Sequence, residues 1–242
     1  MMELHIEKDA HQMSAKLAVW IAEYIQEVLA KQDRFTFVLS GGNTPKILFA
    51  ELVKSPLKES IDWEKVHFFW GDERYVPYED SRNNAKMCFE ELLSKVPAKP
   101  EHIHIMRTDI SPEESAAEYE AILKSYFGES ETTFDFVLNG MGDDGHTLSL
   151  FPGFAVVHEK EKWVTSFWLT IQDMYRITLT APVVNKAACV AFMAVGENKA
   201  KVLKDVLEGE TNLDLYPSQI IQPESGELHW FVDDAAASLL TL

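Results

Sequence analysis

"FTFVLSGGNTP" (35–45) is the stretch that most directly indicates the fold. Its first five residues have the aromatic and β-branched content of a strand. Gly41 and Gly42 then allow a tight turn. Pro45 follows two polar residues, Asn43 and Thr44, which is typical of the first turn of a helix with a polar cap. The stretch therefore predicts a strand that passes through a glycine turn into a helix.

The same alternation continues along the chain. Hydrophobic patterns predict further strands at 66–70, 103–106, 134–138, 163–169, 176–180, 189–195 and 228–233, and helices at 8–31, 83–96, 112–127, 198–209 and 235–240. Several central strands are apolar nearly throughout, as strands buried on both faces are. We therefore expect an α/β, Rossmann-like fold in which a mostly parallel sheet is flanked by helices on both faces, as a single domain over residues 1–242.

Composition limits the partners and the compartment. The net charge of −17 disfavours nucleic acid and anionic membranes. The N-terminus lacks the pattern of a signal peptide, and the longest apolar run, 187–195, is about half of a membrane span. Cys88 and Cys189 have no metal-ligand spacing and are expected to be buried free thiols. We expect a cytoplasmic protein that is a monomer or a weak dimer.

Ligands of parallel sheets bind beyond the carboxyl ends of the strands, so the residues that follow each strand matter most. Ser40, Gly41, Gly42 and Thr44 follow the strand at 35–39 and lead into a helix N-terminus, which favours an anion. No Gly-Lys-Ser/Thr follows, so this is not a nucleoside triphosphate loop, and a smaller phosphate ester fits better. A tight turn with Asn43 or Thr44 as the helix cap is the structural alternative.

Three basic residues lie near other strand ends. Arg74 follows the strand at 66–70, and its planar fork suits phosphate, with Asp72 or Glu73 holding it in place. Arg176 opens a strand, and Lys199 begins a helix, where a cation makes sense if it faces an anion. Each could instead be a solvated turn or strand end. Together they would form the local positive site that an anionic sugar needs on an acidic protein.

The loop "GMGDDG" (140–145) matches the dinucleotide fingerprint G-x-G-x-x-G, but the match is weak. Pro152 comes too early for the long helix that should follow, and two aspartates would repel phosphates. A metal site would need a further group of ligands, and no such spacing is found.

The remaining interpretation of this loop is acid–base chemistry. A histidine oriented by a carboxylate suits it, and the glycines let Asp144 and His146 converge. A structural Asp-Gly turn followed by an incidental histidine is the alternative.

Seven segments together resemble the 6-phosphogluconolactonase family, in their usual order: "LSGGNTP", "FFWGDERYVP", "NNAKM", "GMGDDGHTLSLFP", "RITLTAPVVNKA", "VGENKA" and "PESGELHWFVDDAAASLL". The resemblance runs from about residue 35 to the C-terminus. The combination of G-D-E-R with D-G-H-T-x-S-L-F-P is specific to this family within its superfamily. Related glucosamine-6-phosphate deaminases carry D-E-Y where this chain has Asp72-Glu73-Arg74, and follow D-G-H with a different ending.

The resemblance implies hydrolysis of 6-phospho-D-glucono-1,5-lactone to 6-phosphogluconate in the pentose phosphate pathway, without a metal or an organic cofactor. It makes His146 the general base, with Asp144 beside it. The contacts to the phosphate and sugar of the lactone would fall on Ser40, Gly41, Gly42, Thr44, Arg74, Arg176 and Lys199. Leu148 and Asn83 depart from the family's usual alanine and serine, which bears on substrate tolerance rather than on reaction class.

Two other functions remain as alternatives to the lactonase. A glucosamine-6-phosphate deaminase/isomerase is the nearest enzyme, and Arg74 argues against it. A non-catalytic sugar-phosphate sensor usually carries a DNA-binding segment, for which this chain has neither spare length nor suitable charge.

Overall fold

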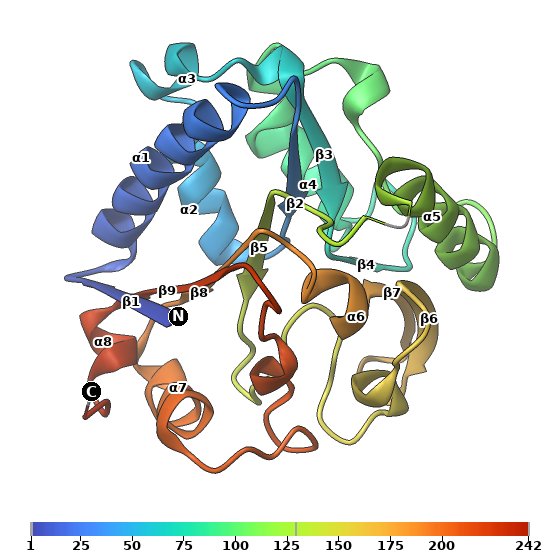
Figure 1. Ribbon diagram of the computed structural model, residues 1–242. Coiled ribbons are helices and arrows are strands. Elements are labelled where there is room, and N and C mark those ends of the chain that lie inside the picture. The colour runs from blue at the N-terminus through green and yellow to red at the C-terminus, as the bar shows by residue number, and fades with distance from the viewer. Residues whose placement is uncertain (1, 129, 242) are drawn as a thin grey trace.

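A six-stranded parallel sheet forms the centre of the protein (Figure 1). The computed structural model describes residues 2–128 and 130–241. In spatial order the strands are β1 (Met2–Glu7), β9 (Glu227–Asp233), β8 (Cys189–Ala194), β5 (Phe136–Gly140), β2 (Phe35–Leu39) and β3 (Val66–Trp70). Every neighbouring pair is parallel. β2 and β8 are buried along their whole length, as their apolar sequences predict.

Helices cover both faces of this sheet, which confirms the predicted fold class. On one face, the buried residues of α1 (Ala10–Leu29), α2 (Asn43–Leu52) and α4 (Asn84–Glu91) share a core cluster. The cluster on the other face includes residues of α5 (Pro112–Phe127), α6 (Ala181–Val184), α7 (Ala200–Glu208) and α8 (Asp234–Ala237). A one-turn helix, α3 (Leu57–Ser60), follows α2. Asp9 caps α1, and a capping box with Ser111 and Glu114 begins α5.

A second, antiparallel sheet consists of β4 (Asp72–Arg74), β7 (Met174–Leu179) and β6 (Val164–Leu169), in that order. The strands predicted at 163–169 and 176–180 therefore exist but lie outside the parallel sheet. Val164, Ile177 and Leu179 belong to the same buried cluster as Val137 of β5. The small sheet thus packs on one face of the large one, and its first strand carries Arg74.

Several sequence-based boundaries are wrong. The strand predicted at 103–106 is a single bridge between Ile103 and Phe68 at the edge of the sheet, followed by irregular backbone. The helix predicted at 83–96 ends at Glu91, because the backbone of Leu92 leaves the helical region. β1 was not predicted. Its sequence, MELHIE, alternates apolar and polar residues as a strand with one covered face does, so the local pattern could have indicated it.

Cys88 in α4 and Cys189 in β8 are both buried and free, as expected. Within residues 2–128 and 130–241, no helix has the length and apolar character needed to cross a membrane.

The order of the strands fixes where a ligand can bind. From β2 the chain moves outward to β3, then returns to the other side of β2 to form β5, β8 and β9. The strand order therefore reverses between β2 and β5. The segments that leave the carboxyl ends of these two strands diverge there and leave a crevice.

Candidate active site

A pocket of about 300 Å³ lies at this crevice. Every predicted site residue except Asp144 lines it: Ser40, Gly41, Gly42, Thr44, Arg74, His146, Arg176 and Lys199. Asp144 lies behind His146 and contacts its ring. The structure therefore brings together residues from β2, β4, β5, β7 and β8 that are separated by up to about 160 positions in the sequence.

The glycine turn after β2 forms one wall. Gly42 has a φ of 107° and occupies the cap position of α2. No side chain in the described part of the chain caps this helix, so the alternative in which Asn43 or Thr44 serves as the cap is wrong. A Cβ added at Gly41 would lie 1.9 Å from Oδ1 of Asn84, so a larger residue would displace the Asn84 side chain. The N-terminus of α2 thus faces the pocket with uncapped backbone N–H groups.

Two arginines also line the pocket. Arg74 and Arg176 are direct partners in the antiparallel β4–β7 pair, so two positive side chains lie across from one another. Like charges at such a position are unfavourable without an anion between them. The Nε atoms of both are buried and have no hydrogen-bond partner among the described residues. Both arginines line the pocket, so each guanidinium can meet an anionic ligand there.

Glu73 holds Arg74 only through its backbone, because the N–H of Arg74 donates to Oε1 of Glu73 at 2.8 Å. No hydrogen bond between the described residues joins the Arg74 guanidinium to either neighbouring acid. Asp72 accepts a contact from Nη1 of Arg176 at 3.4 Å, and its Oδ2 accepts a hydrogen bond from Ser149. Glu73 is fully buried, and its carboxylate accepts hydrogen bonds from the backbone N–H groups of Asn84 and Ala85 at the start of α4. Burial raises the pKa of Glu73 to about 8, against the opposing effect of these N–H donors. Arg74 itself is held by the carbonyl of Arg82, to which its Nη1 donates.

Lys199 connects the end of β8 to the loop after β5. Its Nζ donates to the carbonyl oxygen of Met141 at 2.7 Å and forms an ion pair with Asp143. The ion pair and a hydrogen bond from Asn198 keep the pKa of Asp143 below its usual value. Lys199 therefore lies in the pocket wall, already anchored to the loop that carries His146.

His146 and Asp144 converge as the sequence predicts. Oδ1 of Asp144 lies 2.5 Å from Nδ1 of His146. Burial acts to raise the pKa of Asp144, but its contacts with His146 outweigh this effect and lower the pKa. An ionised Asp144 accepts a hydrogen bond from the Nδ1–H of His146. Nε2 of His146 is then the unprotonated, basic nitrogen of the ring. The ring of His146 also stacks on Phe151, with centroids 4.0 Å apart.

Tertiary contacts hold the loop in shape. A Cβ added at Gly142 would lie 2.0 Å from Nδ1 of His146, so this close approach requires glycine. Gly145 has a φ of 79°, and its carbonyl accepts two hydrogen bonds from Ser218. Thr147 donates back to the carbonyl of Gly140. The loop is thus a rigid support for His146 rather than a nucleotide-binding turn.

Several further residues line the pocket. Gln172 accepts a hydrogen bond from Nη2 of Arg176 at 2.5 Å, and nothing in its local sequence indicates this role. Asn84 lies within a family-like segment but carried no predicted role, and its Nδ2 donates to the carbonyl of Asp72. Leu148 lies in the pocket with a φ of 54°, a conformation that leucine rarely adopts.

Comparison with known proteins shows the family of the chain. The profile of the family described as glucosamine-6-phosphate isomerases/6-phosphogluconolactonase matches residues 8–230. The chain belongs to this family. Within it, the chain is 39% identical over 238 residues to 6-phosphogluconolactonase 3, chloroplastic, of Arabidopsis thaliana, covering 93% of the chain and 71% of that protein. It is 38% identical over 222 residues to 6-phosphogluconolactonase of Nostoc sp., covering 90% of each.

Solved structures of the glucosamine-6-phosphate isomerase/6-phosphogluconolactonase family share the whole fold. 6-Phosphogluconolactonase from Trypanosoma cruzi matches with a TM-score of 0.86 at 26% identity, over 100% of this chain and 98% of that chain. A monomeric glucosamine-6-phosphate deaminase matches with a TM-score of 0.85 at 18% identity, over 99% of this chain and 100% of that chain. The second likeness concerns the fold alone, because its identity is low.

Proposed function

We propose that this protein hydrolyses 6-phospho-D-glucono-1,5-lactone to 6-phosphogluconate, which is one step of the pentose phosphate pathway. The observation that carries the proposal is one pocket in which His146, oriented by Asp144, faces a cluster of anion-binding groups. The relatives named 6-phosphogluconolactonase, at 38–39% identity over most of the chain, support the same reaction.

In the proposed reaction, Nε2 of His146 takes a proton from water as the water oxygen attacks the lactone carbonyl. Asp144 stabilises the imidazolium that forms, and such a positioned base contributes about 10² to 10⁴ in rate. The tetrahedral intermediate then breaks its bond to the ring oxygen, which receives the proton held by His146. The product is the open-chain acid, which loses its carboxylic proton to water.

The phosphate of the substrate is proposed to lie between the N-terminus of α2 and the arginine pair. Uncapped N–H groups after Gly41 and Gly42 and the guanidinium groups of Arg74 and Arg176, which line the pocket, are suitable donors. Ser40 and Thr44 line the same wall, and Lys199 lies between it and the catalytic loop. This arrangement would leave the lactone ring beside His146.

A lactonase assay with fresh 6-phosphogluconolactone, corrected for spontaneous hydrolysis, tests the proposal. Hydrolysis well above the uncatalysed rate is the expected result. Release of ammonia from glucosamine 6-phosphate would instead identify a deaminase, and binding of 6-phosphogluconate without turnover of the lactone would identify a sensor. Either outcome would overturn the lactonase.

We further propose that residues 1–242 work as one domain, because the buried cluster between the two sheets is continuous. We also propose a cytoplasmic monomer or weak dimer. Free buried cysteines fit a reducing compartment, and the negative net charge of −17 disfavours nucleic acid and membrane surfaces as partners.

A further inference from the structure

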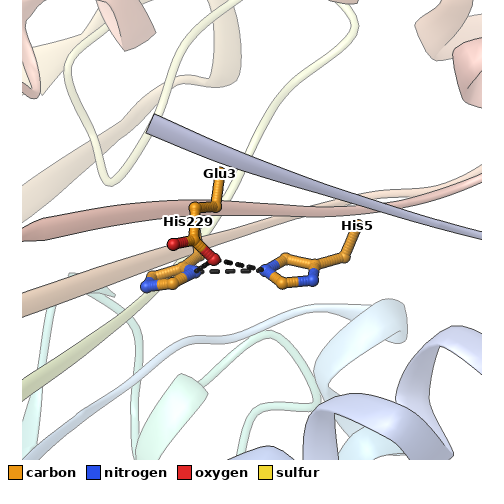
Figure 2. A group of neighbouring side chains, drawn as sticks. All are labelled: Glu3, His5 and His229. Atoms are coloured by element: carbon orange, nitrogen blue, oxygen red, sulfur yellow. Dashed lines mark hydrogen bonds and ion pairs between the residues drawn. The ribbon is translucent and has the colours of Figure 1, made fainter. Parts of the chain in front are cut away.

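A second group of chemically active side chains lies at the opposite end of the sheet, near the beginnings of β1 and β9. Glu3 is the direct partner of His229 in the parallel β1–β9 pair, and His5 is two residues further along β1. Side chains two residues apart on a strand share a face. Figure 2 shows the Glu3 carboxylate and the two imidazole rings converging.

The three ligand atoms form a compact triangle. Nε2 of His5 lies 3.1 Å from Nδ1 of His229, and Oε2 of Glu3 lies 3.9 Å and 3.7 Å from these two nitrogens. A point equidistant from three atoms at these separations is about 2.1 Å from each, which matches Zn–N and Zn–O bond lengths of about 2.0–2.2 Å. These three separations therefore accommodate one metal ion.

Neighbouring side chains orient the two rings. Oε2 of Glu227 lies 3.3 Å from Nε2 of His229, so this carboxylate accepts a hydrogen bond from the Nε2–H. The lone pair of Nδ1 is then free and points toward Glu3 and His5. A carboxylate behind a ligating histidine is a recurrent feature of zinc sites. The ring of His5 stacks on Phe231 with centroids 4.2 Å apart, and Trp20 packs on His229.

We propose that Glu3, His5 and His229 bind one Zn²⁺ ion, or a similar late first-row divalent cation, with water in the remaining position. Two imidazole nitrogens and one carboxylate oxygen suit this class of ion, whereas Mg²⁺ and Ca²⁺ prefer oxygen ligands alone. His229 is 3% exposed, while the Glu3 side chain is 60% exposed, so the ion reaches the site from the Glu3 side.

A second possible ligand group, Cys189 with Glu227 and His229, shares a residue with the proposed site. Cys189 is 0% exposed, so it lies away from the solvent that delivers the ion. The group with Glu3 and His5 is therefore the favoured one.

The ion would act as a clamp for the edge of the sheet. Among the described residues β1 pairs only with β9, and Glu3 and His5 would join it to His229 through metal bonds. The family resemblance implies no metal, and the ligand spacings in the sequence do not indicate this site either. His5 and His229 are 224 residues apart, and only the strand pairing brings them together. The site lies at the amino ends of the strands, so the bound ion would not touch the catalytic pocket.

The test uses the full chain, freed of any affinity tag and of bound metal by chelation. Titration with Zn²⁺ in a calorimeter should give one ion per chain. At a free Zn²⁺ concentration of about 100 times Kd, the Tm should rise by about 5–10 °C. His5→Gln and Glu3→Gln should each weaken Zn²⁺ binding at least about tenfold, because each removes one ligand. The matched control is His11→Gln, an exposed histidine of α1, which should leave the affinity unchanged.

Substitution of His229 is avoided, because this residue is buried and its loss would also disturb packing. Absence of stoichiometric Zn²⁺ binding would overturn the proposal, since the two histidines would then simply hydrogen-bond to one another. Binding of equal strength in His5→Gln would overturn it as well. Lactone hydrolysis should be the same with and without Zn²⁺, and a loss of activity on chelation would contradict a purely structural clamp. This arm is independent of the calorimetric one, so failure of the lactonase proposal leaves the metal test intact.

Discussion

Oδ1 of Asp144 lies 2.5 Å from Nδ1 of His146, in a loop that places the ring of His146 in the wall of the pocket. Replacement of His146 by Ala should therefore lower kcat for the lactone by about 10² to 10⁴, because the base is lost. Binding of 6-phosphogluconate, measured by calorimetry, should change little. A His146→Ala variant with full activity would refute the mechanism.

Asp144→Asn should lower kcat without a comparable effect on KM. The amide cannot stabilise the imidazolium of His146 and can present a donor to Nδ1, which favours the wrong tautomer. The pH profile of kcat/KM, compared with that of the native protein, should therefore change in shape as well as in height. Identical profiles would show that Asp144 does not act on His146.

Loss of an arginine should act on substrate binding rather than on the chemical step. Arg74→Ala should raise KM for the lactone about tenfold or more, with a smaller effect on kcat, because a charge-assisted contact to phosphate is lost. The matched control is Arg82→Ala. Its side chain is exposed and pairs with Asp80 outside the pocket, so KM should remain as in the native protein. An unchanged KM in Arg74→Ala would argue against a phosphate site here.

Gly71 and Leu148 should be energetically coupled. A Cβ added at Gly71 would lie 2.6 Å from Cδ2 of Leu148, so Gly71→Ala should destabilise the protein by about 1–3 kcal/mol through overpacking. In the double variant with Leu148→Ala this collision is absent, so most of the loss should be recovered. Urea unfolding of the native protein, both single variants and the double variant measures the coupling. Strict additivity of the two changes would contradict the contact.

His67 should make the protein sensitive to acid. Its Nδ1 contacts the Tyr126 hydroxyl at 2.8 Å, and its ring stacks on His102 with centroids 3.7 Å apart. Burial, and next the charges of His102 and Arg34, lower the pKa of His67 to about 4. The unfolded chain therefore binds this proton at a pH where the folded protein does not. The contribution of His67 to the free energy of unfolding should be fully present above a pH of about 6.5, the usual pKa of histidine. It should be lost as the pH falls toward 4.

The measurement is Tm as a function of pH between 7 and 4. His67→Gln cannot take up the proton, so its Tm should fall less steeply than that of the native protein across this range. His104, whose pKa is also lowered by burial, should leave part of the slope in place. His11→Gln, at an exposed position, should show the native slope. Equal slopes in the native protein and His67→Gln would contradict the lowered pKa.

Much of the fold follows from local patterns. The apolar runs at 35–39 and 189–195 predicted buried parallel strands because a strand covered on both faces has no polar side to show. The strand predicted at 103–106 was wrong. This segment meets the edge of the sheet in a single bridge between Ile103 and Phe68, and the regularity of an edge segment depends on what lies beside it. The end of α4, predicted at residue 96 and found at Glu91, also depends on tertiary packing.

The sequence by itself determined the class of fold, the glycine turn after β2 and the loop that joins Asp144 to His146, because each depends on residues a few positions apart. Only the tertiary structure decided which charges meet. Antiparallel pairing of β4 with β7 places Arg74 opposite Arg176 and brings Asp72 into an ion pair with Arg176. Parallel pairing of β1 with β9 brings His5 into contact with His229. The physical reason is that pairing between strands distant in sequence is fixed by packing of the whole chain, and local residue preferences carry no record of the partner.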